Sequence, residues 1–273
     1  MTGTMQHFIL SVVMLVCLAW PMGSWAAAGD PATTQPAMLR AVWASTLSPA
    51  MDSPDEIRAL VAATRRAGMN AVIAQVRHRG ITYYRSAIEP PAPAMRARAG
   101  FDPLATLLRE ARDTTVPSER LRVHAWFNVF SMAGVRDDPA MPADLRAQYN
   151  GWFSPDTSGS LTRFLDPGIP EVQDHLIALI SECVRQYDVD GVNLDYIRYP
   201  EEDAGYHPVA LARFNRLHGR TGVPSPRDPQ WNAFRRDQIT AFVRRCAMTV
   251  WTARPEALVT VNAVGFGAPR ARF

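Results

Sequence analysis

The chain has 273 residues, of which 47% are hydrophobic and 20% are charged, and its formal net charge is +3. A chain of this length can bury one large core, which is ordinary for a single α/β domain. Its arginines are scattered among acidic residues and form no long basic run. A nucleic-acid-binding protein is therefore disfavoured.

The first 28 residues have the pattern of a signal peptide. An apolar run extends from Phe8 to Trp20, and the small residues 26–28 that follow suit a signal peptidase. A retained membrane anchor is the alternative, but the run is short for a bilayer span. Cys17 follows Val16, where a lipoprotein signal has a small residue. We expect export to the periplasm or the exterior, without stable membrane insertion after cleavage.

Residues 29–38 are predicted to be a flexible lead, and residues 39–273 to be the folded domain. Only Cys183 and Cys246 remain after cleavage, and both lie in helical patterns. A disulfide between them is permitted in an oxidising compartment, but two buried thiols fit the pattern better. The histidines are dispersed without ligand spacing, so neither a metal site nor a cofactor is predicted.

Strands and helices alternate along the domain. Proline at the first helical position and an N-capping Ser or Asp before it indicate several helix starts. The elements predicted in chain order are a strand at 39–45, a helix at 53–68, a strand at 71–77, a helix from 102, a strand at 121–129, a helix at 170–187, a strand at 191–196, a helix at 228–251 and a strand at 258–264.

Loop lengths favour one α/β architecture over another. The helix-to-strand links 68–70 and 188–190 are short, whereas the strand-to-helix links 78–101 and 131–169 are long. Long loops at the carboxyl ends of strands are typical of a TIM-type (β/α)8 barrel, which carries its active site there. A doubly wound sheet is the competitor, but residues 44–48 after the first strand lack its glycine-rich turn. We predict a barrel of which about five βα units are present.

Asp195 is the main catalytic candidate. It ends a strand in which Val192 and Leu194 alternate with Asn193 and Asp195. A carboxylate in an apolar strand is costly unless it is partnered or used, and strand-terminal carboxylates commonly serve barrel enzymes. A buried aspartate that caps a loop is the alternative. Asp190, at the opposite end of the strand, is expected to fix a loop or helix contact.

Other polar and aromatic residues lie on the same strands, near their carboxyl ends. Aromatic faces stack on sugar rings, while amides and guanidinium groups bond sugar hydroxyls, so this set favours a carbohydrate ligand. The alternatives are core packing for the two tryptophans and the histidine, and a buried acidic partner for the arginine. The predicted substrate-binding residues are Trp43, Gln75, Arg77, His124, Trp126, Asn128, Asn193, Tyr196, Arg198 and Asn262.

Four segments resemble the glycoside hydrolase-like family 10 of exported bacterial barrel proteins. They are Leu39-Arg40-Ala41-Val42-Trp43, Gly68 to Arg77 with Tyr84-Arg85-Ser86 and Glu89-Pro90, His124-Ala125-Trp126-Phe127-Asn128, and Leu165-Asp166-Pro167-Gly168 with Asp190 to Pro200. The resemblance implies hydrolysis of glycosidic bonds in a polysaccharide or cell-wall glycan. The last segment is also similar to the chitinase family 18 motif, but Ile197 stands where that motif has its acidic glutamate, so a chitinase-type mechanism is disfavoured.

The sequence offers several candidates for a second catalytic carboxyl group. Glycoside hydrolysis usually needs two, and the loop residues Glu89, Glu201, Glu202 and Asp203 are candidates. A strand beyond the five predicted ones is another source, because a closed barrel needs eight, and we expect a longer gene product. Two hypotheses follow. The protein is an exported glycosidase, or it is a non-catalytic glycan-binding protein or inactive fragment that keeps the sugar cleft.

Overall fold

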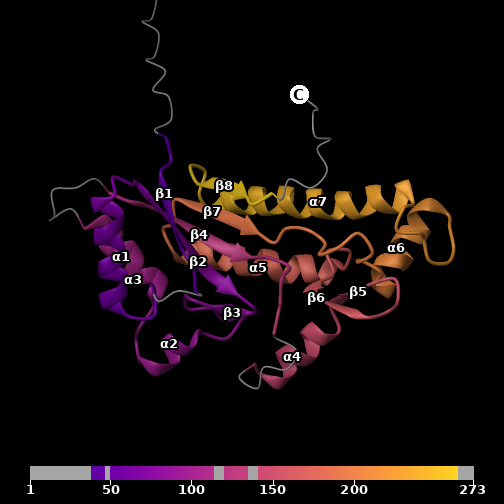
Figure 1. Ribbon diagram of the computed structural model, residues 1–273, viewed down its shortest axis with the longest axis horizontal. Coiled ribbons are helices and arrows are strands. Elements are labelled where there is room, and N and C mark those ends of the chain that lie inside the picture. The colour runs from indigo at the N-terminus through magenta and orange to yellow at the C-terminus, as the bar shows by residue number, and fades with distance from the viewer. Residues whose placement is uncertain (1–37, 47–49, 114–119, 135–140, 264–273) are drawn as a thin grey trace, which may run out of the picture. The chain divides into compact units, whose positions relative to one another are not determined.

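The computed structural model describes residues 38–46, 50–113, 120–134 and 141–263 (Figure 1). The predicted signal peptide, nearly all of the lead and the last residue of the fifth predicted strand lie outside these ranges. From Leu39 onward the chain forms one compact unit.

A parallel sheet forms the centre of this unit. Its strands are hydrogen-bonded in the order in which they occur along the chain, which is the order of a (β/α)8 barrel. The main strands are β1 (Ala41–Ala44), β2 (Ala71–His78), β4 (Arg122–Asn128), β7 (Gly191–Asp195) and β8 (Leu258–Val261), and the short β3 (Ile81–Thr82) pairs antiparallel with β2. Within the described ranges β1 and β8 are not paired, so the sheet there is open.

Four of the helices, α1, α3, α5 and α7, lie at the predicted places. Ser53 accepts a hydrogen bond from the Glu56 backbone N–H, and Asp102 accepts one from the Ala105 backbone N–H, as helix N-caps do. The helices are α1 (Pro54–Arg66), α2 (Pro93–Ala97), α3 (Pro103–Arg112), α4 (Ala143–Asn150), α5 (Pro170–Gln186), α6 (Pro208–His218) and α7 (Pro229–Ala253).

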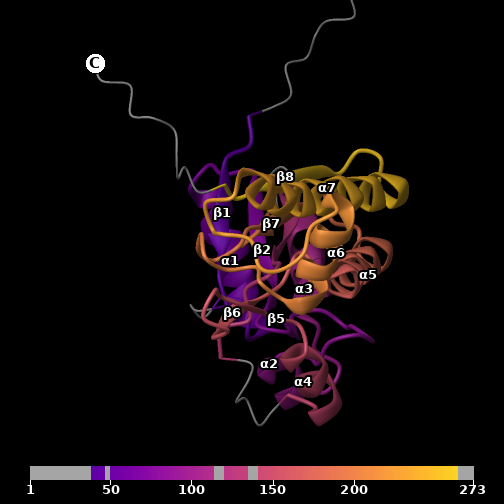
Figure 2. The same ribbon diagram turned by 90° about the vertical axis from the view of Figure 1, so that its right-hand side faces the viewer.

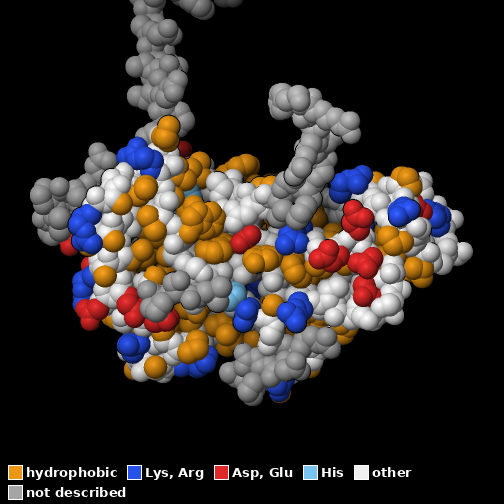
Figure 3. Space-filling model, in the orientation of Figure 1, with side chains coloured by type: hydrophobic (Ala, Val, Ile, Leu, Met, Phe, Trp, Pro, Cys, Tyr) orange, Lys and Arg blue, Asp and Glu red, His pale blue; other side chains and the backbone are white. Residues whose placement is uncertain are grey.

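The two faces of the sheet differ. Side chains alternate along each strand, so Val123, Ala125 and Phe127 of β4 point to one face, where they are fully buried in the main core. Residues of α1, α3, α5 and α7 belong to that same core. Figure 2 shows α5 and α7 together on one side of the strands. The opposite face carries Trp126, which alternates with Ala125 and Phe127, and Trp43 packs against Trp126. Figure 3 shows hydrophobic and charged side chains together on the surface that faces the viewer in Figure 1.

The long loops at the carboxyl ends contain structure that the sequence patterns did not predict. The link after β2 holds β3 and α2, and the link after β4 holds α4 and an antiparallel hairpin of β5 (Phe153–Pro155) and β6 (Leu161–Leu165). The link between β7 and α7 holds α6. The short helix-to-strand links are as predicted.

Cys183 of α5 and Cys246 of α7 are buried free thiols. This confirms the prediction of two thiols over a disulfide.

Within the described ranges, no helix combines the length and the apolar character that a membrane crossing needs.

Candidate active site

Asp195 lies at the carboxyl end of β7 with both carboxyl oxygens engaged. The indole Nε1–H of Trp126 donates to Oδ2 at 3.1 Å, and the backbone N–H of Tyr196 donates to Oδ1 at 2.8 Å. Asp195 is level with Asn128 of the neighbouring strand, and its side chain is only partly buried. Two donors from different directions fix the plane of the carboxyl group while one edge stays open to solvent.

Aromatic rings border this carboxyl group. Trp43 packs edge-to-face on Trp126, with ring centroids 4.9 Å apart, and Trp43 is 47% exposed. Tyr196 is exposed as well and has a φ of 52°, a left-handed conformation that costs a tyrosine about 1 kcal/mol or more. Strained backbone of this kind is common at functional sites. Together these rings give the uncovered face an apolar platform beside a carboxylate.

Arg198 lies beside the aromatic rings of Tyr196 and Phe164. Its guanidinium carbon is 5.7 Å from the ring centroid of Tyr196 and 5.6 Å from that of Phe164. At these distances the cation is held by the faces of the rings. Arg198 is only partly buried, and its Nη1 donates to the backbone carbonyl of Pro200 at 3.2 Å.

The four predicted amide residues join neighbouring strands. The Gln75 amide donates to Asn128 Oδ1 at 3.1 Å, and the Asn193 amide donates to Thr260 Oγ1 at 2.9 Å and to Asn262 Oδ1 at 3.2 Å. Gln75, Asn128 and Asn193 are buried, whereas Asn262 is partly exposed. The buried amides therefore hold the strand ends in place, and Asn262 remains available to a ligand.

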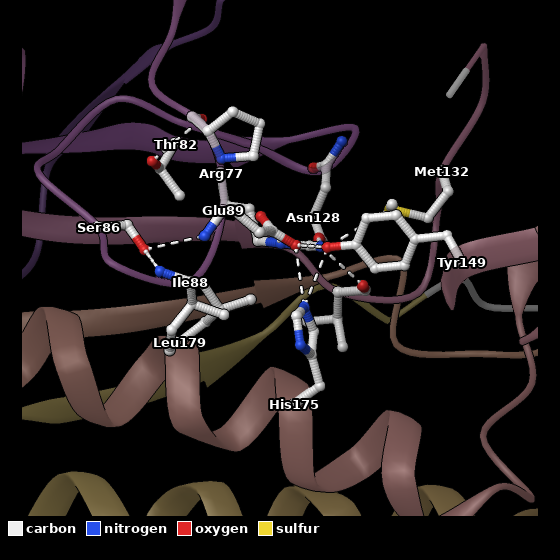
Figure 4. Close-up of polar contacts among 12 residues, drawn as sticks. Arg77, Thr82, Ser86, Ile88, Glu89, Asn128, Met132, Tyr149, His175 and Leu179 are labelled. Atoms are coloured by element: carbon white, nitrogen blue, oxygen red, sulfur yellow. Dashed lines mark hydrogen bonds and ion pairs between the residues drawn. The ribbon is translucent and has the colours of Figure 1, made fainter. Parts of the chain in front are cut away.

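Arg77 corrects the sequence prediction, because it cannot reach a sugar on this surface. It is fully buried and forms a two-pronged ion pair with Glu89, at 2.8 Å from Nε and 2.6 Å from Nη2 (Figure 4). It also donates to the backbone carbonyl of Val129 at 2.9 Å. The pairing of β2 with β4 shifts register between Gln75 and Arg77. Such a bulge turns Arg77 away from the face that Gln75 occupies.

Glu89 is corrected as well, since it was a candidate for the second catalytic carboxyl. It is buried and accepts hydrogen bonds from Arg77 and from the Tyr149 hydroxyl, and His175 Nε2 lies 3.3 Å from its Oε1 (Figure 4). Burial alone would raise the pKa of Glu89, but Arg77 and His175 outweigh it and hold the pKa at about 2. A carboxylate that remains ionised and shielded from solvent cannot donate a proton to a sugar.

His124 is the third correction. It is fully buried and pairs in register with Gly191, the first residue of β7. It therefore lies toward the amino ends of the strands, whereas Asp195 is the last residue of β7. A Cβ on Gly191 would come within 2.5 Å of His124 Nδ1, so the glycine makes room for the ring. Among the described residues neither ring nitrogen has a hydrogen-bond partner, and burial lowers the pKa of His124. It therefore acts as a core residue.

Asp190 has the structural role expected of it. It accepts a hydrogen bond from the Val123 backbone N–H at 2.9 Å and pairs with Arg120 at 2.6 Å. These contacts join the amino ends of β4 and β7, on the side opposite to Asp195.

Two features of the mouth were not predicted. His78 ends β2 and contacts Thr46 through its ring, although neither residue belongs to a recognisable motif. A cavity of about 1240 Å³ lies next to the carboxyl end of β7, between residues 197–203 and residues 226–240. It begins two residues beyond Asp195 and does not include it, so it adjoins the candidate site. Glu201, Glu202 and Asp203 line this cavity, and all three are exposed.

The fold and the site define an α/β barrel protein with an acidic, aromatic mouth at the carboxyl ends of its strands. Residues 38–268 match the family described as Glycosyl hydrolase-like 10. The chain belongs to this family, as its four sequence segments predicted.

Two relatives extend the comparison. The chain is 30% identical over 217 residues to glycosyl hydrolase DigH of Escherichia coli O6:H1, covering 74% of this chain and 45% of the relative. It is 27% identical over 206 residues to glycosyl hydrolase YngK of Bacillus subtilis, covering 74% of this chain and 38% of the relative. The chain therefore spans less than half the length of these relatives.

A solved structure confirms the fold. The α-L-fucosidase isoenzyme 2 from Paenibacillus thiaminolyticus superposes with a TM-score of 0.61 at 18% identity, covering 83% of this chain and 33% of the fucosidase. At this identity the likeness concerns the fold alone. The parallel sheet is thus that of a TIM-type barrel, and the described part of the chain contains four βα units and a fifth strand, β8.

Proposed function

We propose that the protein is an exported glycoside hydrolase that cleaves glycosidic bonds in a polysaccharide or cell-wall glycan, with Asp195 as a catalytic carboxylate. The observation that carries this proposal is the partly exposed carboxylate of Asp195, which accepts a hydrogen bond from the indole of Trp126 on the adjacent strand, with the exposed indole of Trp43 packed against Trp126. Membership of a glycosyl hydrolase-like family supports it. Such a mouth is where barrel enzymes carry their chemistry.

The hydrogen bonds of Asp195 favour one of the two roles open to it. Both oxygens accept from fixed donors, Trp126 Nε1–H and the Tyr196 N–H. A carboxyl group held in this way is suited to act as a nucleophile or general base, which uses a lone pair, more than as the acid that protonates the leaving oxygen. We assign the acid role to another residue, and Glu201, Glu202 and Asp203 are the acidic residues on the loop that follows β7.

The aromatic rings and the partly exposed donors would hold the sugar. Trp43 and Tyr196 offer exposed faces, while Arg198 and Asn262 offer donors at the same end of the sheet. Stacking on a ring face and hydrogen bonding to hydroxyls are the two interactions that a pyranose requires. The apolar run from Phe8 to Trp20 supports export, which would bring the enzyme to extracytoplasmic glycans.

Reducing-end release tests the proposal. Purified peptidoglycan glycan strands, cellulose, xylan and chitin are incubated with the wild type and with Asp195→Asn. We expect the wild type to release reducing ends from at least one glycan, and the variant to lose turnover while it still binds that glycan. Turnover by Asp195→Asn equal to that of the wild type would remove Asp195 from the mechanism.

A second function is favoured by one specific observation. The Arg77–Glu89 ion pair removes one of the predicted second carboxyls from the site. A glycan-binding protein without turnover would keep the aromatic platform and would not need two catalytic carboxyl groups. In the same assay it would bind a glycan without releasing reducing ends from any of them.

A further inference from the structure

His78 has a defined place at the mouth. It is the last residue of β2, it is partly buried, and its Nδ1 lies 2.9 Å from Thr46 Oγ1. The same hydroxyl lies 2.8 Å from Gln75 Oε1, which also accepts from the Thr46 backbone N–H at 2.9 Å. The Thr46 hydroxyl thus links Gln75 to His78, and Tyr83 also hydrogen-bonds with the Thr46 side chain.

The protons in this group can be assigned by counting donors and acceptors. The Gln75 oxygen must face Thr46, because the reversed amide would put an N–H₂ group against the Thr46 backbone N–H. The Thr46 hydroxyl has a single hydrogen, and it must point to Gln75 Oε1, which can only accept. The hydroxyl therefore presents a lone pair to His78, so Nδ1 carries the hydrogen. In the neutral ring this leaves Nε2 as an acceptor.

The surroundings keep this ring neutral. Burial, followed by the positive charges of Arg79 and Arg77, lowers the pKa of His78 from 6.5 to about 4. The charged groups that act on the ring are both cations, and Thr46 is uncharged. At neutral pH the ring is therefore an uncharged acceptor in the field of two arginines, which suits a hydroxyl donor and not a cationic ligand.

We propose that His78 contacts the glycan directly, its Nε2 accepting a hydrogen bond from a sugar hydroxyl on the β2 side of the site. This inference rests on the proposed function. Gln75 bonds Asn128, and Asn128 is level with Asp195, so the mouth runs continuously from β2 across β4 to β7. At about 4.8 Å per strand, β2 and β7 lie roughly 10 Å apart, a distance that a bound oligosaccharide can span.

Two substitutions separate this role from a structural one. In His78→Asn the amide can replace Nδ1–H as the donor to Thr46 but has no atom at the position of Nε2. In His78→Gln the longer side chain places an acceptor near the position of Nε2 but loses the Nδ1 donor. A ligand-binding role requires the first change to be harmful, whereas a structural link to Thr46 requires the second to be harmful.

The test measures dissociation constants for chitotetraose, cellotetraose and xylotetraose by calorimetry, with each His78 variant made in the Asp195→Asn protein to prevent turnover. For the tetraose that binds, we expect His78→Asn to weaken binding about 2–10-fold, the range for one neutral hydrogen bond, and His78→Gln to restore most of the affinity. Unchanged binding by His78→Asn, or the reverse order of the two variants, would overturn the inference. Binding of none of the three tetraoses would overturn it as well.

Reducing-end release and glycan binding together distinguish a failure of this inference from a failure of the proposed function. If the wild type releases reducing ends and Asp195→Asn does not, the proposed function stands whatever His78 does. If His78→Asn binds as tightly as its parent under those conditions, only the role of His78 is lost.

Discussion

Replacing Glu89 by Gln should destabilise the protein strongly, because it leaves Arg77 as a buried cation without a counter-charge. Both side chains of this pair are almost completely buried, at 1% and 0% exposure. Breaking a buried ion pair on one side costs about 3–5 kcal/mol. The pKa of Glu89 gives a similar figure, since a fall from 4.5 to about 2 corresponds to ~3 kcal/mol. Glutamine keeps the shape and one acceptor, so the loss is mainly electrostatic.

Urea unfolding followed by circular dichroism measures this cost. Thermal unfolding measures the same cost as a fall in Tm. For a domain of this size, ~3–5 kcal/mol corresponds to a fall of about 6–20 °C. Glu256→Gln is the matched control, because Glu256 is exposed and should change stability by less than about 0.5 kcal/mol. If Glu89→Gln unfolds within about 1 kcal/mol of the wild type, the buried pair does not stabilise the fold as argued.

The same pair predicts how stability depends on pH. The pKa of Glu89 is lower in the folded state than in the unfolded chain, so its stabilisation is complete above about pH 4.5 and is lost as the pH falls toward 2. Glu89→Gln has no carboxyl to titrate there. Its stability should therefore decline less than that of the wild type between pH 4.5 and 2, and parallel declines would contradict the assignment.

Three further predictions concern the core and the site. Gly191→Ala should cost about 1–3 kcal/mol, because its Cβ would come within 2.5 Å of the buried His124 ring, and Gly151→Ala, with 3.4 Å to its nearest neighbour, is the control for urea unfolding. Burial raises the pKa of Cys246 to about 12, so the native protein should not react with Ellman's reagent at pH 8 and should react once unfolded, whereas rapid native labelling would contradict the burial. Trp126→Phe removes a donor to Asp195, the proposed catalytic carboxylate, and should lower kcat roughly 10–100-fold, with an unchanged kcat as the contrary result.

Helix starts and strand identities could be predicted from local chemistry. Pro54 and Pro103 follow an N-capping Ser and Asp, and these caps fix where α1 and α3 begin whatever surrounds them. The elements inside the long loops could not be predicted in the same way. β3 is two residues long and owes its form to pairing with β2, a contact that no local pattern records.

The sheet face on which a residue lies could be predicted where alternation along a strand is regular. Trp126 and Asp195 follow regular alternation on adjacent strands, and the Trp126 indole reaches the Asp195 carboxylate. Arg77 fails because a bulge after Gln75 shifts the register, and a bulge is invisible in a pattern of residue types. His124 lies on the predicted strand but too close to its amino end, and depth along a strand depends on the register between strands, which the sequence does not state.

The most direct test of the account compares two aspartates on one strand. Asp195 and Asp190 end the same segment at opposite sides of the sheet, and only Asp195 lies at the mouth. Initial rates of reducing-end release are measured for Asp195→Asn and Asp190→Asn on the glycan that the wild type cleaves, per folded molecule. We predict a loss of at least about 100-fold for Asp195→Asn and near wild-type turnover for Asp190→Asn. Equal rates for the two variants would contradict a catalytic role for Asp195.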